Sequence, residues 1–146
     1  MNNKELSISV LNNIDIFHNL IRIVNKDRYK LDKSLTEKQF FALSELRKHE
    51  KMELKNLSMQ LHVSTSSLCI LLNKLVEKEY VYREEDKRDR RNTFYGLTQK
   101  GTDVFNGQVE KFIEVIEEKI DTLSEQDKEK LFTCMNDVGA IIGKLR

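Results

Sequence analysis

The most distinctive stretch of the chain is a run of six charged residues, Asp86-Lys87-Arg88-Asp89-Arg90-Arg91. Four cations crowded into five positions repel one another, and a solvated turn has no need of them. A phosphate backbone supplies the missing counter-charge, because each neutralised phosphate releases condensed counterions. The run therefore predicts contact with nucleic acid, and a charged tip that is only solvated is the alternative.

Within this run the residue types suit different partners. Arginine fits a narrow minor groove, where the potential is most negative, and Arg91 is our candidate for that role. Asp89, two residues earlier, has a carboxylate that can accept a hydrogen bond from the Arg91 guanidinium and orient it. We expect Lys87, Arg88 and Arg90 to contact the phosphate backbone.

A second group of candidates lies in the segment that begins at Ser64. Leu68, Leu72 and Leu75 recur at helical spacing and define a buried face. The opposite face carries hydroxyls that donate or accept hydrogen bonds, an amide that pairs with adenine, an apolar group that suits a thymine methyl and an ammonium that reaches phosphate. The candidate DNA contacts here are Ser64, Thr65, Ser66, Ile70, Asn73 and Lys74. An ordinary surface helix whose serines only cap its start is the alternative.

The elements that must position these residues follow from apolar spacing and from capping residues. Helical spacing predicts one long helix over about residues 5–30, and the capping box Thr36-Glu37-Lys38-Gln39 predicts the start of a second. A short helix over residues 54–61 stops at His62, and Ser64 caps the next helix. Two helices joined by so tight a turn are typical of a helix-turn-helix.

After Tyr80 the apolar period changes. Segments 81–84 and 93–97 are rich in β-branched and aromatic residues and flank the charged run, which predicts a β-hairpin with a polar tip. Thr98 and Ser124 are expected to cap two final helices. The predicted fold is mainly α with a small β-hairpin wing, a winged helix-turn-helix domain flanked by N- and C-terminal dimerisation helices.

The two ends of the chain are more apolar along one face than one small core requires. We therefore expect residues 1–34 and 99–146 to form dimerisation helices, and residues 35–98 to form the DNA-binding lobe. The alternative is that the end helices fold back on their own domain.

Composition narrows the class of protein. The chain has 146 residues, of which 39% are apolar and 34% charged, with a formal net charge of +1. No apolar stretch approaches the roughly 20 residues that span a bilayer, and no leader segment is evident, so we expect a cytoplasmic protein without a membrane partner. The cysteines and histidines show no metal-ligand spacing, so neither a metal nor a cofactor is expected.

The chain resembles the MarR family of bacterial winged-helix regulators along nearly its whole length. The charged run looks like the family's D-x-R-D-x-R wing, and Leu97-Thr98-Gln99-Lys100-Gly101 looks like its L-T-x-x-G helix start. The resemblance implies an obligate homodimer on a palindromic operator, a helix beginning at Thr65 that reads the major groove, and Arg91 in the minor groove oriented by Asp89. It also implies repression that a small phenolic or lipophilic molecule relieves, or, in some members, a response to oxidants.

Two positions depart from the family pattern. Glu79 stands where the family usually has glycine, so a turn that favours a positive φ must be reshaped or strained. Ile70 stands where the family often has a basic or polar residue, which leaves the operator sequence open.

Candidates for sensing are less specific than those for DNA binding. His18, Tyr29, Phe40 and Phe41 would line a ligand cleft between the dimer helices and the DNA-binding lobe, and core aromatics with a surface histidine are the alternative. Cys69 is a redox candidate on the reading helix, with a passive thiol as the alternative. Cys134 is expected in the core.

The function predicted from these residues is a sequence-specific transcriptional regulator, a homodimeric repressor released by a small aromatic or lipophilic ligand. One alternative is an oxidant-responsive regulator that uses Cys69. Another is a winged-helix module for protein assembly, in which the wing meets an acidic partner. An enzyme is not expected, because the sequence has no glycine-rich phosphate loop, nucleophile elbow or paired-carboxylate motif, and so no catalytic residue is assigned.

Overall fold

The computed structural model describes residues 1–145, which form six α-helices and a small antiparallel sheet. The mainly α fold with a hairpin wing is as predicted. The elements in chain order are α1 (Asn3–Leu31), α2 (Glu37–Arg47), β1 (Met52–Glu53), α3 (Leu54–Leu61), α4 (Thr65–Glu77), β2 (Val81–Glu85), β3 (Thr93–Leu97), α5 (Gln99–Ile120), α6 (Glu125–Ile142) and the 3-10 turn η1 (Gly143–Leu145). The chain divides into two compact units, Met1–Phe112 and a second that begins at Ile113.

Local side-chain caps define where four of the helices begin. The hydroxyls of Thr36, Ser64, Thr98 and Ser124 each accept a hydrogen bond from the backbone N–H three residues later, at 3.0–3.2 Å. Each such cap stabilises a helix by about 1 kcal/mol, because it satisfies a donor that has no partner inside the helix. All four helix starts were predicted from the sequence.

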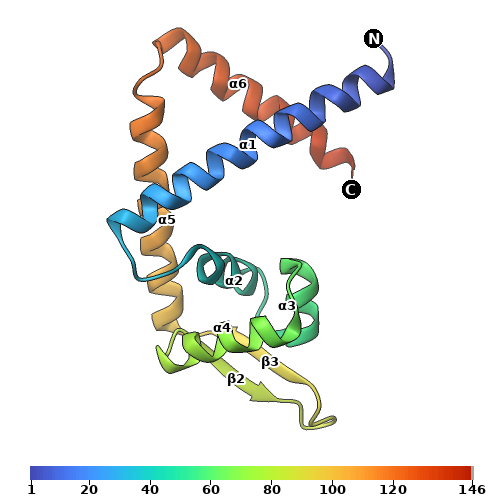
Figure 1. The fold of residues 1–146 in the computed structure, drawn as a ribbon, viewed down its shortest axis with the longest axis vertical. Coiled ribbons are helices and arrows are strands. Elements are labelled where there is room, and N and C mark those ends of the chain that lie inside the picture. Colours follow the sequence, from blue (N-terminus) through green and yellow to red (C-terminus); the bar gives the residue numbers. More distant parts are fainter. Residues whose placement is uncertain (146) are drawn as a thin grey trace. The chain divides into compact units, whose positions relative to one another are not determined.

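The first unit is organised around α2, α3 and α4, which gather over the hairpin β2–β3, while the tip of the hairpin extends away from the helices (Figure 1). The strand order is β1-β3-β2, and Val81 pairs with Leu97 at the base of the hairpin. The strand β1 was not predicted from the sequence, because its two residues are too few to show the alternating pattern of a strand. Its Met52 lies opposite Tyr95, so β1 adds a buried side chain to the core.

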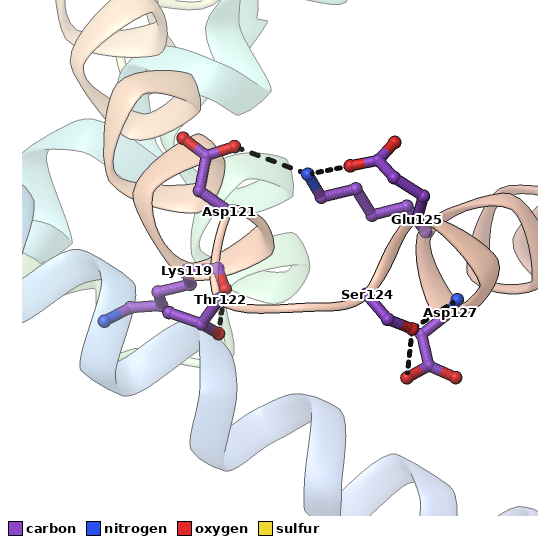
Figure 2. A network of polar contacts seen from close by, with 7 residues as sticks. Lys119, Asp121, Thr122, Ser124, Glu125 and Asp127 are labelled. Atoms are coloured by element: carbon purple, nitrogen blue, oxygen red, sulfur yellow. Dashed lines mark hydrogen bonds and ion pairs between the residues drawn. The ribbon is translucent and has the colours of Figure 1, made fainter.

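The turn between α5 and α6 is held by short-range polar contacts, which Figure 2 shows. The Lys128 ammonium lies 3.8 Å from the Asp121 carboxylate and 2.8 Å from that of Glu125. The Ser124 hydroxyl accepts from the Asp127 backbone N–H and donates to the Asp127 carboxylate. These contacts fix the start of α6, although this helix has no apolar core of its own. No residue of α6 is buried, and Cys134, which we expected in the core, is exposed.

Near the end of α1, the side chain of Arg28 is completely buried. Its guanidinium donates to the backbone carbonyl of Leu35 at 3.2 Å, to the side-chain oxygen of Gln108 in α5 and, at 3.4 Å, to Asn25. It also lies over the ring of Phe40 in α2, 5.0 Å from the centroid. One side chain therefore joins α1, the segment that follows it, α2 and α5.

The first prediction concerns this junction. Arg28→Ala should lower the free energy of unfolding by about 2–4 kcal/mol, because it leaves a cavity and removes the donor from the buried Leu35 carbonyl and Gln108 amide. Arg28→Lys should restore only part of this loss, since an ammonium lacks the planar fork. The exposed Arg22 of the same helix is the matched control, and Arg22→Ala should change stability by less than about 0.5 kcal/mol. Urea unfolding measures all three, and equal stability of the two alanine variants would contradict the role of Arg28.

Candidate nucleic-acid interface

The helix α4 separates a buried face from an exposed face as predicted. Leu68, Leu72 and Leu75 are buried, whereas Ile70 has 63% of its surface exposed. An isoleucine so exposed has no packing role of its own in the chain. The remaining candidates on this helix, which are Thr65, Ser66, Asn73 and Lys74, are exposed as well.

Ser64 differs from the other candidates because its hydroxyl is already engaged. It accepts from the Ser67 backbone N–H at 3.2 Å and donates to the Ser67 hydroxyl at 2.9 Å. The structure therefore places Ser64 first as a helix cap, which is the alternative that the sequence left open for this position. Its direct contact with DNA stays a prediction.

Cys69 lies half-buried on a flank of α4. Its sulfur is 3.9 Å from the Asn73 side-chain nitrogen, and it lies beside the phenol of Tyr95. Burial raises the pKa of the Tyr95 phenol, and the neighbouring Cys69 adds to that shift. Neither neighbour carries the positive charge that marks reactive thiols.

The tip of the wing is shaped by two successive aspartate turns. The Asp86 carboxylate accepts from the backbone N–H of Arg88 at 2.9 Å, and the Asp89 carboxylate accepts from that of Arg91 at 3.0 Å. Each is a side-chain mimic of a backbone turn, which aspartate favours. Asp86 was not among the candidate site residues, although the repeated spacing of aspartate and arginine is the signal that would have identified it. The two turns present Lys87, Arg88, Arg90 and Arg91 to solvent.

The contact between Asp89 and Arg91 differs from the one we expected. The hydrogen bond of Asp89 goes to the Arg91 backbone, and its carboxylate lies 3.9 Å from Nε of the guanidinium, with the Arg91 side chain 94% exposed. So exposed an ion pair contributes little stability. Asp89 thus sets the path of the backbone and leaves the guanidinium available to a ligand.

A left-handed residue connects α4 to the wing. Glu79 has a φ of 63°. Its backbone N–H donates to the carbonyl of Val76 and that of Tyr80 donates to Leu75, the pattern that closes many helices with glycine at this position. Of the two outcomes expected for Glu79, the structure shows the strained turn. The carboxylate pairs with Lys100 at 3.3 Å on the surface.

Among the four residues proposed for ligand binding, Phe40 and Phe41 are in edge contact, with ring centroids 5.8 Å apart, and the role of the four in ligand binding stays a prediction. His18 and Tyr29 are exposed on α1, and Phe40 is buried and stacks on Phe105 at 5.2 Å between ring centroids. Phe41 borders a groove of about 540 Å³ between α2, the end of α3 and α4. Within residues 1–145, no cluster of His, Cys, Asp and Glu could hold a metal ion, and no helix is long and apolar enough to cross a membrane.

A helix-turn-helix followed at once by a charged hairpin defines a winged helix-turn-helix DNA-binding protein. The sequence pattern of the MarR family matches residues 35–93. The chain is 30% identical over 117 residues to the HTH-type transcriptional regulator MhqR of Bacillus subtilis, covering 80% of this chain and 79% of that one. It is 28% identical over 117 residues to the HTH-type transcriptional regulator SarZ of Staphylococcus haemolyticus, covering 80% and 78%.

Solved structures show the same fold. Transcriptional regulator Tm0710 from Thermotoga maritima superposes with a TM-score of 0.72 at 23% identity, over 92% of this chain and 96% of that one. A variant of MepR from S. aureus bound to an oligodeoxyribonucleotide superposes with a TM-score of 0.62 at 23% identity, over 95% and 98%. The chain belongs to the MarR family and is a DNA-binding transcriptional regulator.

The second prediction tests the strain at Glu79. Glu79→Gly should stabilise the chain by up to about 1 kcal/mol, because relief of the left-handed backbone outweighs the flexibility that glycine adds to the unfolded state. Thermal unfolding should show a midpoint raised by roughly 2–4 °C. The neighbouring Lys78 has a φ of −78°, and Lys78→Gly should destabilise instead. A lower midpoint for Glu79→Gly would show that the turn holds no strain.

Proposed function

We propose that this regulator is a homodimeric repressor that binds a palindromic operator and leaves it when a small aromatic or lipophilic ligand binds. The observation that carries the proposal is the tip of the wing. Two aspartates accept hydrogen bonds from backbone N–H groups and four cations face solvent, and the contact of Arg91 with Asp89, at 3.9 Å, leaves the Arg91 side chain 94% exposed. A duplex supplies the phosphates that this surface lacks.

Apolar surface on the end helices supports pairing of two chains through residues 1–34 and 99–146. Large apolar side chains remain exposed along α1 and α6, beyond the single exposed apolar residues that any surface carries. Those on α1 include Leu6, Leu11, Ile14, Ile16, Phe17 and Ile23, and those on α6 include Leu131, Phe132, Met135, Val138 and Ile141. A second copy would cover them, and a twofold pair matches a palindromic site.

In the proposed complex the lobe of residues 35–98 makes the DNA contacts. The exposed face of α4 enters the major groove, where Ile70 packs on a thymine methyl and Asn73 pairs with adenine. Ser64, Thr65, Ser66 and Lys74 contact bases or phosphates beside them. Arg91 enters the minor groove, while Lys87, Arg88 and Arg90 contact phosphates. The oligodeoxyribonucleotide bound to the MepR variant supports DNA as the ligand of this fold.

Selection of bound fragments from the source genome is the experiment that tests the proposal. We expect enrichment of one palindrome near genes that the protein controls. A module used only for protein assembly would enrich no sequence, and that result would overturn the repressor.

The third prediction separates the two kinds of contact on the wing. Arg91→Ala should weaken binding to the selected duplex roughly tenfold, with the largest loss on A·T-rich flanks, because their narrow minor groove attracts arginine. Lys87→Ala should weaken binding to all duplexes alike and lower the slope of log K against log salt by about one. Anisotropy titrations across a salt series measure both effects.

The controls for this prediction are stability and an unrelated cation. Neither wing variant should shift thermal unfolding, since both side chains are exposed. Lys26→Ala, on the exposed surface of α1, should leave affinity unchanged. Unchanged affinity of Arg91→Ala on every flank would remove the minor-groove role.

The fourth prediction concerns Ile70. Replacing thymines of the selected half-site with deoxyuridine, one at a time, should weaken binding about threefold to fivefold at one position, because each replacement removes only a methyl group. The variant Ile70→Ala should bind the parent and substituted duplexes equally. A loss of the same size in both proteins would assign that methyl to another side chain.

A further inference from the structure

We propose that the groove between α2 and α4 is a third DNA-contact region of the lobe, which holds a stretch of one phosphate backbone through Lys38, Ser67 and Phe41. The inference rests on the proposed function, and it adds α2 to the elements that bind DNA. The groove has a volume of about 540 Å³ and lies along one flank of α4. The other flank of α4 faces the wing, where Cys69 lies beside Tyr95 of β3.

Two ammonium groups give the groove its charge. Lys38 comes from the first turn of α2 and Lys74 from the last turn of α4, and both line the groove. Neither has an ion-pair partner within residues 1–145, and no acidic residue of that range lines the groove. Each ammonium can therefore pair with a phosphate without first leaving a carboxylate. A concave surface with charge of one sign attracts a ligand of the opposite sign.

Ser67 adds a neutral donor to the two cations. Its hydroxyl accepts a hydrogen bond from the Ser64 hydroxyl at 2.9 Å, and its own proton has no acceptor within residues 1–145. The residue is exposed in the first turn of α4 and lines the groove. Hydroxyls that donate and ammonium groups that pair are the groups with which proteins commonly hold phosphate oxygens.

The apolar wall of the groove fits the sugar of a nucleic-acid strand. Phe41 from α2 and Val63 from the turn line it, and each is 38% exposed. A deoxyribose presents C–H groups directly beside its phosphates, so one strand offers an apolar and an anionic surface together. Contact with Phe41 would remove apolar surface of both molecules from water.

DNA is the occupant that the position of the groove favours. Ile70 and Lys74 line the groove and also belong to the face of α4 that we place in the major groove. A helix in the major groove lies between two phosphate backbones, one along each flank. Because α4 lies between α2 and the hairpin (Figure 1), the backbone on the flank away from the wing would pass Lys38.

Salt dependence separates the phosphate contact from the sugar contact in the full chain. Lys38→Gln should weaken duplex binding roughly threefold and reduce the slope of log K against log salt by about one, on operator and mixed-sequence duplexes alike. Phe41→Ala should weaken binding by a similar factor and leave the slope unchanged, because an apolar contact releases no counterions. Lys33→Gln is the matched control, since Lys33 is exposed just before α2 and does not line the groove. It should alter neither affinity nor slope.

Replacing single phosphates of the selected duplex with neutral methylphosphonates identifies the partner of Lys38. One replacement in each half-site should weaken binding of the parent chain about threefold and have no further effect on Lys38→Gln, because the contact is already lost. Lys87→Ala should still lose affinity at that phosphate. Phe41 also contacts the ring of Phe40, so thermal unfolding must show that Phe41→Ala is folded. The exposed Lys38 tests the proposal independently of that variant.

A Lys38→Gln variant that matches Lys33→Gln in affinity and slope would overturn the inference. So would equal losses in the parent and in Lys38→Gln at every methylphosphonate, because α2 would then lie outside the interface. Failure of the proposed function gives a different result. If no palindrome is selected, yet Lys38→Gln still reduces the salt slope on a mixed-sequence duplex, the repressor is rejected and the groove contact stands.

Discussion

The arrangement of the first unit depends on a charge that water cannot reach. Burial lowers the pKa of Arg28, and the carboxylates of Asp32 and Glu37 act in the opposite direction. Withdrawing such a charge from water costs several kcal/mol, while each hydrogen bond to it returns about 1.5–3 kcal/mol. Its acceptors come from its own helix, from the following segment and from α5, so they are satisfied together only when those elements meet. The Nη2 atom of Arg28 is buried as well, and it has no hydrogen-bond partner within residues 1–145. Because the Arg28 guanidinium is so costly to bury, its main effect is to select one geometry for the junction, and its net contribution to stability is smaller.

A second constraint acts at the two ends of the helix-turn-helix. His62, at the end of α3, and Glu79, after α4, both have positive φ, at 53° and 63°. In both turns the N–H of the left-handed residue and the N–H of the residue after it donate to carbonyls of the last helical turn, so each chain reversal is satisfied although neither residue is glycine. The helix α4 therefore lies between two sharp changes of direction. After the second of these turns Tyr80 packs against the core and continues directly into the wing.

The features that the sequence predicted correctly are those decided by neighbouring residues. Capping hydroxyls, the apolar period of α4 and the hairpin around the charged run all depend on spacings of two to four residues. Arg28 occupies the same apolar stripe as Val24, yet residue type favours solvent for an arginine, and only the acceptor from α5, distant in sequence, explains its burial. The short strand β1 exists only because β3 lies beside it. Aromatic type alone likewise cannot distinguish Phe40, which stacks in the core, from its neighbour Phe41, which borders a groove.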